Sequence, residues 1–331
     1  MHAYIVVDAE EARAVVGEQR RSEKNQGCDA NCESVHRASI LKNSSRSAPP
    51  VSIHNSGMYL SLHPATIGWR VAWPEMATLA AEAGYEGAVI PGKQPLPIDA
   101  THGFPVRATA MQLPVEVRQD QAMFVSTLPR LQETCEFAAQ AGCQVALLGV
   151  PPSSEQPRAE QARIYRERLK QCCAILDEYS IRLALECITP MQSRRAHPHE
   201  FIFDNAQMLD FGLTVSPNIG LIIDSWHWHH AGSSPEWISG IPADRILDVH
   251  LSDSPADPPE QIRDAQRLLP GDGVIDLKLF FQLLDAKAYS GAVEVEIFGG
   301  LSDLTPSEAA RAAYEGTRKV LVNIGEKAPS R

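Results

Sequence analysis

Short apolar runs alternate with longer amphipathic stretches from about Met58 to the C-terminus. In the longer stretches the apolar residues recur at the spacing of one helical face. Such alternation is typical of parallel strands joined by crossover helices. We expect strands at Met58–Leu62, Gly87–Ile90, Ala108–Leu113, Val145–Val150, Ile181–Cys187, Ile219–Asp224, Ile246–Leu251 and Ala292–Phe298.

These strand signals favour a closed barrel over an open sheet. The chain has neither the Gly-rich fingerprint of dinucleotide-binding sheets nor a phosphate-binding P-loop. We expect helices near Pro74–Ala83, Gln121–Ala141, Glu160–Tyr179, Asn205–Phe211, Pro235–Ile238, Asp276–Ala286 and Ser307–Val322. The predicted fold class is therefore α/β, as a single (β/α)8 TIM barrel.

Residues 1–52 lack this pattern. They contain polar stretches with no apolar period long enough to bury a face. We interpret residues 1–52 as an irregular, partly disordered N-terminal extension and residues 53–331 as the barrel. Cys28 and Cys32 form a spaced pair in this extension, but two further metal ligands are not found nearby, which favours exposed thiols.

The composition and charge of the chain limit the kinds of partner that it can have. Of the 331 residues 44% are hydrophobic and 21% charged, and no apolar run approaches the roughly 18 residues that a membrane span needs. The run Ile5–Val7 is too brief for a secretory signal. A net charge of -11 with scattered Lys and Arg disfavours nucleic acid, and seven cysteines without a CxxC pair fit a reducing compartment. We expect a cytoplasmic protein with neither membrane nor nucleic-acid partners.

Each of the last four predicted strands reaches a polar residue where its apolar run closes. These residues are Glu186, Asp224, His250 and Glu296. Because the carboxyl ends of the strands surround the mouth of such a barrel, the four side chains should converge. A single acid there is often held by a helix N-terminus or a loop, but four successive polar ends point to a function.

Three converging carboxylates repel one another and cannot all stay ionised in a partly desolvated cavity without a counter-ion. A divalent metal ion resolves this conflict. Three oxygen ligands and one imidazole suit Mn²⁺ first, with Mg²⁺, Co²⁺ or Zn²⁺ as alternatives. Open coordination positions would accept two substrate oxygens, such as a sugar carbonyl and its adjacent hydroxyl.

Three further residues near these ends have competing interpretations. Glu294 rivals Glu296, but alternation places it deeper on the same face of the strand. His227 follows Asp224 by three residues, in the expected loop, and can reach the second coordination shell or a substrate oxygen. Arg267 is a candidate clamp for a substrate oxygen, with a plain surface arginine as the alternative.

A resemblance to the xylose isomerase-like TIM-barrel superfamily, with its sugar isomerases and ketose 3-epimerases, rests on five segments. They are Leu183-Ala184-Leu185-Glu186, Ile223-Asp224-Ser225-Trp226-His227, Val249-His250-Leu251-Ser252-Asp253, Pro270-Gly271-Asp272-Gly273 and Val295-Glu296-Ile297-Phe298.

The resemblance implies one metal held by the four strand-end residues, with Glu186 and Glu296 exchanging the substrate proton. It also implies that His227 and Arg267 bind oxygens of a small sugar or cyclic polyol. Barrels of this sort often pair, so a homodimer is among the expectations. Abstraction of a proton beside a carbonyl gives an enediolate, the first step of isomerisation, epimerisation and dehydration alike.

The superfamily also contains a nuclease branch of the endonuclease IV type, which this chain does not match. That branch needs three zinc ions and extra histidines, whereas the second and third strands here run into Ile90-Pro91-Gly92-Lys93 and Met111-Gln112-Leu113. Ala265-Gln266-Arg267 replaces the Asp-x-His of that branch.

Our first hypothesis is a metal-dependent sugar isomerase or epimerase. The alternative is a lyase of the same barrel, such as an inosose or 3-dehydroshikimate dehydratase. A barrel that only binds a sugar is the non-enzymatic alternative.

Overall fold

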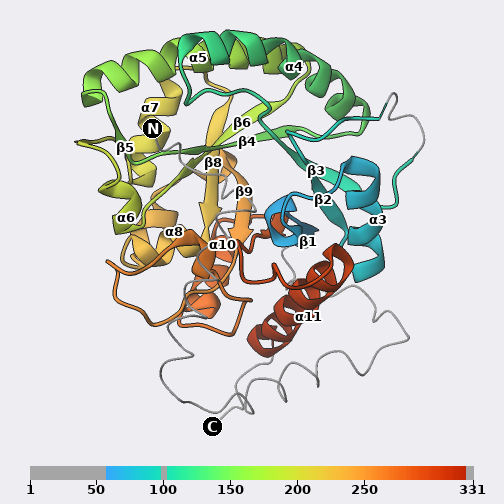
Figure 1. The fold of residues 1–331 in the computed structure, drawn as a ribbon. Helices are drawn as coiled ribbons and strands as arrows, with labels where there is room; N and C mark the ends of the chain where they lie inside the picture. Colours follow the sequence, from blue (N-terminus) through green and yellow to red (C-terminus); the bar gives the residue numbers. More distant parts are fainter. Residues whose placement is uncertain (1–56, 98–102, 326–331) are drawn as a thin grey trace, which may run out of the picture.

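A computed structural model describes residues 57–97 and 103–325 of the chain (Figure 1). The predicted extension and its Cys28 and Cys32 lie outside the described residues, so the domain boundary near residue 52 stays a prediction.

Eight parallel strands close into one barrel, in the spatial order β1-β10-β9-β8-β6-β4-β3-β2. The predicted fold is confirmed. The barrel strands are β1 (Tyr59–Leu62), β2 (Gly87–Ile90), β3 (Arg107–Gln112), β4 (Val145–Val150), β6 (Arg182–Cys187), β8 (Ile219–Asp224), β9 (Ile246–Leu251) and β10 (Ala292–Val295). The prediction for the last strand was three residues too long, so Glu296 lies just beyond β10.

Two very short strands were not predicted. β5 (Ser153–Ser154) and β7 (His199–Glu200) pair antiparallel and join the loops that follow β4 and β6. Two residues are too few to produce an alternating pattern, so sequence periodicity could not reveal them.

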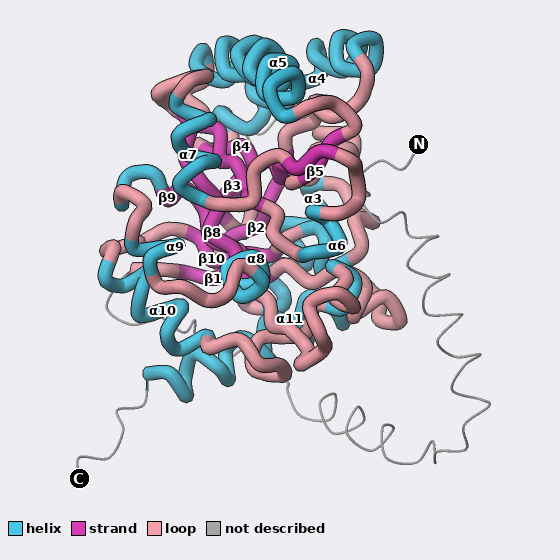
Figure 2. The backbone as a smooth tube through the Cα atoms, turned by 90° about the vertical axis from the view of Figure 1, so that its left-hand side faces the viewer, coloured by secondary structure: helices cyan, strands magenta, loops and turns pink. Residues whose placement is uncertain are grey.

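Helices lie outside the strands, as Figure 2 shows. They are α3 (Trp73–Ala83), α4 (Gln121–Gln140), α5 (Arg158–Glu178), α6 (Met191–Arg194), α7 (Asn205–Leu213), α8 (Ser225–His230), α9 (Glu236–Ser239), α10 (Leu277–Ala286) and α11 (Pro306–Gly325), with the 3-10 turns η2 (Pro64–Ile67), η3 (Ala243–Arg245) and η4 (Asp264–Gln266). No helix of the described residues is long and apolar enough to cross a membrane.

Aspartate caps begin several of the crossover helices. The carboxylates of Asp120, Asp204 and Asp276 accept backbone N–H groups in the first turns of α4, α7 and α10. Each cap satisfies a donor that a helix N-terminus otherwise leaves unpaired. The caps therefore fix where the chain leaves a loop and starts back along the outside of the barrel.

The barrel interior is layered. A small apolar cluster inside the barrel contains Val89, Ala110, Leu147, Ala184 and Ile222, separate from the large core between strands and helices. Residues two apart on a strand point to the same face. Ala184 and Ile222 therefore lie one layer below Glu186 and Asp224, which places these two residues above apolar side chains.

Candidate metal and active site

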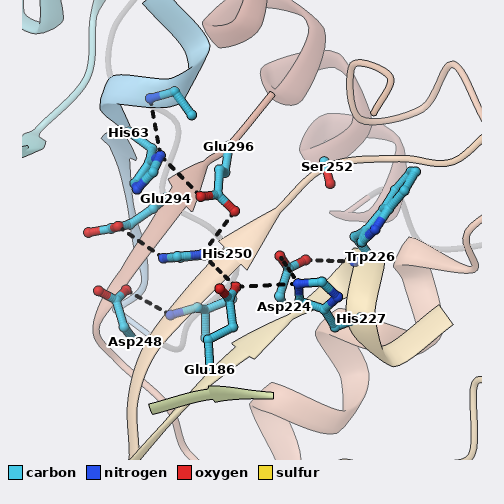
Figure 3. A network of polar contacts seen from close by, with 12 residues as sticks. His63, Glu186, Asp224, Trp226, His227, Asp248, His250, Ser252, Glu294 and Glu296 are labelled. Carbon is cyan, nitrogen blue, oxygen red and sulfur yellow. Dashed lines mark hydrogen bonds and ion pairs between the residues drawn. The ribbon is translucent and has the colours of Figure 1, made fainter. Parts of the chain in front are cut away.

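The four predicted strand-end residues come together at the barrel mouth (Figure 3). One potential ligand atom from each of Glu186, Asp224, His250 and Glu296 lies within 4.8 Å of the others, and all four residues are buried. Parallel pairing of neighbouring strands explains the convergence, because Asp224 is in register with His250. We call these four residues the strand-end cluster.

The distances around His250 fit ligands that share a metal ion. Its Nδ1 lies 3.2 Å from Glu186 Oε1 and 3.1 Å from Glu296 Oε2. A single N–H can be directed well at only one of these oxygens. Two ligands bound to one ion at about 2.1 Å and at right angles are about 3.0 Å apart, so both contacts match neighbouring ligand positions. Buried carboxylates without a cation are costly, which makes the donor set suitable for a divalent ion.

The carboxylates of the cluster differ in their affinity for protons. Burial, the largest cause, raises the pKa of Glu186 to about 7. Burial also favours the neutral form of Glu296, but the charges of His250 and Arg267, together with the neighbouring His63 ring, outweigh it and hold the Glu296 pKa well below its usual range. Two acids with opposite shifts in one site can divide the roles of proton donor and acceptor.

Arg267 lies inside the site and is 2% exposed, so the surface alternative was wrong. Its Nη1 donates to Asp224 Oδ2 at 2.7 Å and to Glu296 Oε2 at 2.9 Å. The guanidinium also lies 5.3 Å from the ring centre of Trp226 and 4.8 Å from that of Phe298. Arg267 therefore links two members of the strand-end cluster, and its contact with substrate stays a prediction.

His227 lies in α8 and not in a loop, which corrects the prediction. The Asp224 carboxylate accepts the Trp226 N–H at 2.7 Å and so starts this helix directly at the end of β8. His227 Nε2 is 3.8 Å from Glu186 Oε1 and 3.9 Å from Asp224 Oδ2. Burial lowers the pKa of His227 to about 3, which keeps the ring neutral at the rim of the cluster. Its role toward substrate stays a prediction.

His63 is a site residue that the sequence reasoning missed. It follows β1 and is 1% exposed, with Nδ1 at 3.3 Å from Glu296 Oε1 and Nε2 at 3.1 Å from Gln112 Nε2. Burial lowers its pKa to about 4. The signal was present, because Leu62-His63 is also an apolar run that meets an imidazole at the strand end.

Gly149 near the end of β4 lies close beside Glu186. The two residues are in register, and a Cβ at position 149 would lie 3.2 Å from Glu186 Oε2 and 3.5 Å from Arg118 Nη2. Arg118 comes from the loop before α4, which Arg168 holds by donating to the carbonyls of Val117 and Gln119. A side chain at position 149 would therefore crowd Glu186, and Arg118 brings a positive charge close to the β4 side of the site.

Comparison with known proteins places this site in a family. The model of the xylose isomerase-like TIM barrel matches residues 77–320. The chain belongs to this family. The resemblance inferred from the strand-end segments is thus confirmed.

Two relatives of this chain are named as enzymes. An inosose isomerase of Bacillus licheniformis is 28% identical over 201 residues, which are 58% of this chain and 66% of that protein. A 3-dehydroshikimate dehydratase of Pseudomonas aeruginosa is 30% identical over 106 residues, 31% of this chain and 16% of that protein. The chain thus spans slightly less than two thirds of that inosose isomerase.

Solved structures have the same fold. A xylose isomerase domain protein from Alicyclobacillus acidocaldarius aligns with a TM-score of 0.70 at 25% identity, over 81% of this chain and 100% of that one. The IolI protein with a bound zinc atom aligns with a TM-score of 0.68 at 22% identity, over 82% of this chain and 100% of that one.

Proposed function

We propose that this chain is a metal-dependent isomerase or epimerase of a small polyhydroxylated carbonyl compound, and that it acts through an enediolate. The observation that carries the proposal is the convergence of three buried carboxylates and one imidazole within 4.8 Å at the barrel mouth. Relatives named inosose isomerase and 3-dehydroshikimate dehydratase both take cyclic polyhydroxylated ketones, which favours that substrate class.

In this proposal Glu186, Asp224, His250 and Glu296 hold one divalent ion, with Mn²⁺ first and Mg²⁺, Co²⁺ or Zn²⁺ as alternatives. The bound ion supplies a Lewis acid that stabilises negative charge on the substrate oxygens. The zinc atom bound in the IolI neighbour supports a divalent ion in general.

Glu186 and Glu296 exchange the proton beside the substrate carbonyl. In the metal-free site burial raises the pKa of Glu186 to about 7, and a bound divalent ion would lower it again, so the loaded site would hold Glu186 as a carboxylate that can accept the substrate proton. Glu296, whose pKa lies well below its usual range, begins as the ionised partner. Because Glu186 is on β6 and Glu296 follows β10, two strands that lie on either side of β9 and β8 in the barrel order, they can act on two faces of a substrate.

His227 and Arg267 would orient substrate oxygens. His227 is a neutral ring whose Nε2 faces the cluster, and Arg267 carries a fixed positive charge into it. A developing negative charge on the substrate would be stabilised by the guanidinium in this desolvated position. Trp226 and Phe298 keep the guanidinium in place through their ring faces.

Elemental analysis tests whether the protein binds one divalent metal ion at the strand-end cluster. The purified wild-type protein should contain one equivalent of a divalent metal, and Asp224→Ala should lose most of it because a ligand is removed. A wild-type protein that binds none of the four candidate metals would contradict the proposal.

Proton exchange separates isomerase, lyase and binding protein. An inosose and 3-dehydroshikimate are incubated with the metal-loaded protein in D₂O. Incorporation of deuterium without loss of water supports an isomerase or epimerase, whereas an absorbing enone product supports the dehydratase. Tight binding with no exchange, unchanged in Glu186→Gln, would indicate a barrel that only binds its ligand.

A further inference from the structure

A second acidic layer lies directly below the strand-end cluster. Asp248 and Glu294 stand two residues before His250 and Glu296, so they face the same way one layer deeper. The corresponding positions on β6 and β8 are apolar, and Asp248 and Glu294 are 2% and 0% exposed. Burying a carboxylate at this depth is costly unless it has a specific partner.

Glu294 has such a partner in the metal-site imidazole. Its Oε2 lies 3.3 Å from Nε2 of His250, the ring nitrogen that faces away from Glu186 and Glu296 (Figure 3). Among the described residues neither of these two atoms has another hydrogen-bond partner. The imidazole is therefore placed between the strand-end carboxylates on one side and Glu294 on the other.

Glu294 is also held by hydroxyl groups of β3 and β1. Thr109 on β3 donates its hydroxyl to Glu294 Oε1 at 3.0 Å, and Ser61 on β1 lies 2.8 Å from the Thr109 hydroxyl. The Glu294 carboxylate thus has one oxygen fixed by Thr109 and the other directed at His250.

The proton positions on His250 decide what this arrangement does. A metal ion at the strand-end cluster needs the lone pair of Nδ1, so the ring proton of the neutral imidazole must be on Nε2. Glu294 is the acceptor for that proton. Resting on the proposed metal site, we propose that Glu294 is a positioning residue that fixes the Nε2–H tautomer of His250 and thereby strengthens metal binding.

A competing interpretation is a second metal between His63, His250 and Glu294, whose potential ligand atoms also lie within 4.8 Å of one another. Both nitrogens of His63 already have contacts, Nδ1 with Glu296 and Nε2 with Gln112. The geometry therefore favours a proton and not a second ion between His250 and Glu294. The metal stoichiometry separates the two.

The test is the affinity for Co²⁺ and Zn²⁺, measured by competition with a chelator of known affinity. Loss of an outer partner of a metal-bound histidine weakens binding about 10- to 100-fold, so Glu294→Gln should show a loss of this size. The d–d absorption of bound Co²⁺ should shift as well, because the orientation and basicity of the imidazole change. Wild type should bind one equivalent.

Asp248→Asn is the matched control. Burial, followed by the nearby Glu294, raises the pKa of Asp248 well above its usual range, so a neutral Asn is a close substitute. The Asp248 carboxylate accepts the N–H of Val249, in the same layer as Glu294. Its metal affinity should stay within about threefold of wild type, since the Glu294 contact with His250 is kept.

A second variant keeps the test informative if Glu294→Gln does not fold. Thr109→Val removes the hydroxyl that fixes Glu294 and should weaken metal binding by a smaller factor, whereas Thr109→Ser should restore it. Wild-type affinity in Glu294→Gln or Thr109→Val, or two equivalents of metal per chain, overturns the role of Glu294. A wild type that binds metal but exchanges no substrate proton contradicts only the proposed function.

Discussion

The two halves of the barrel mouth differ in charge. The half formed by β6, β8, β9 and β10 supplies three carboxylates and an imidazole within 4.8 Å. The ends of β1 to β4 carry the uncharged side chains of His63 and Gln112 and no side chain at Gly149, and the nearby charge of Arg118 comes from the loop after β3. The contrast supports the proposal that one half holds a cation, whereas the other contacts and orients the ligands of the first half.

The largest expected effect is on the charged half. Glu296→Gln keeps the shape of the side chain but removes the charge that Arg267 and His250 contact. Loss of a general acid or base should lower kcat about 10²- to 10⁴-fold. The rate of deuterium incorporation into an inosose at saturating metal measures this loss in kcat. The control is Glu167→Gln, an exposed position on α5 that should keep the wild-type rate. A Glu296→Gln variant with near wild-type exchange would exclude this residue from the proton transfer.

Arg267→Lys tests whether the fixed guanidinium matters. Nη1 reaches both Asp224 and Glu296, and a lysine ammonium lacks the planar form that is held between the two aromatic rings. Removal of a preorganised donor should lower kcat/KM about 10²- to 10³-fold. Arg263→Lys, an exposed arginine four residues earlier, should leave kcat/KM unchanged. Equal values for both variants would mean that Arg267 serves only the fold.

The sequence predicted the charged half well and the neutral half poorly, for a physical reason. A carboxylate that closes a buried apolar run is costly unless it has a partner, so Glu186 and Asp224 are conspicuous in the sequence. A glycine or a neutral imidazole costs little there, which is why Gly149 and His63 were not singled out.

Local geometry set a second limit on prediction. α8 has only six residues and starts because the Asp224 side chain caps it, so no periodic pattern precedes it. The sequence therefore predicts a loop at His227. It does not distinguish a clamp from a surface residue at Arg267, because nothing in that segment indicates that Asp224 and Glu296 meet there. Such pairings depend on strand order, which the barrel alone provides.

On the neutral half, Gly149→Val should affect substrate more than metal. The added Cβ would lie 3.2 Å from Glu186 Oε2 and 3.5 Å from Arg118 Nη2, and the valine methyl groups would crowd both side chains further. If the cost of overpacking, about 1–3 kcal/mol, falls on substrate binding, KM should rise about 5- to 150-fold. Metal content should be preserved, and Gly103→Val, where a Cβ meets nothing within 4 Å, is the control. Loss of the metal in Gly149→Val would instead show that β4 shapes the metal site.

The smallest effect is expected at His63, where the two halves touch. His63 Nδ1 lies 3.3 Å from Glu296 Oε1, and the ring is neutral because burial lowers its pKa to about 4. A hydrogen bond to a charged group is worth roughly 1.5 kcal/mol or more, so His63→Phe should lower kcat about tenfold. His63→Asn, which can still donate toward Glu296, should recover part of the loss. A drop as large as that of Glu296→Gln would place His63 in the proton transfer itself, and the neutral half would then share the chemistry that the charged half is proposed to carry.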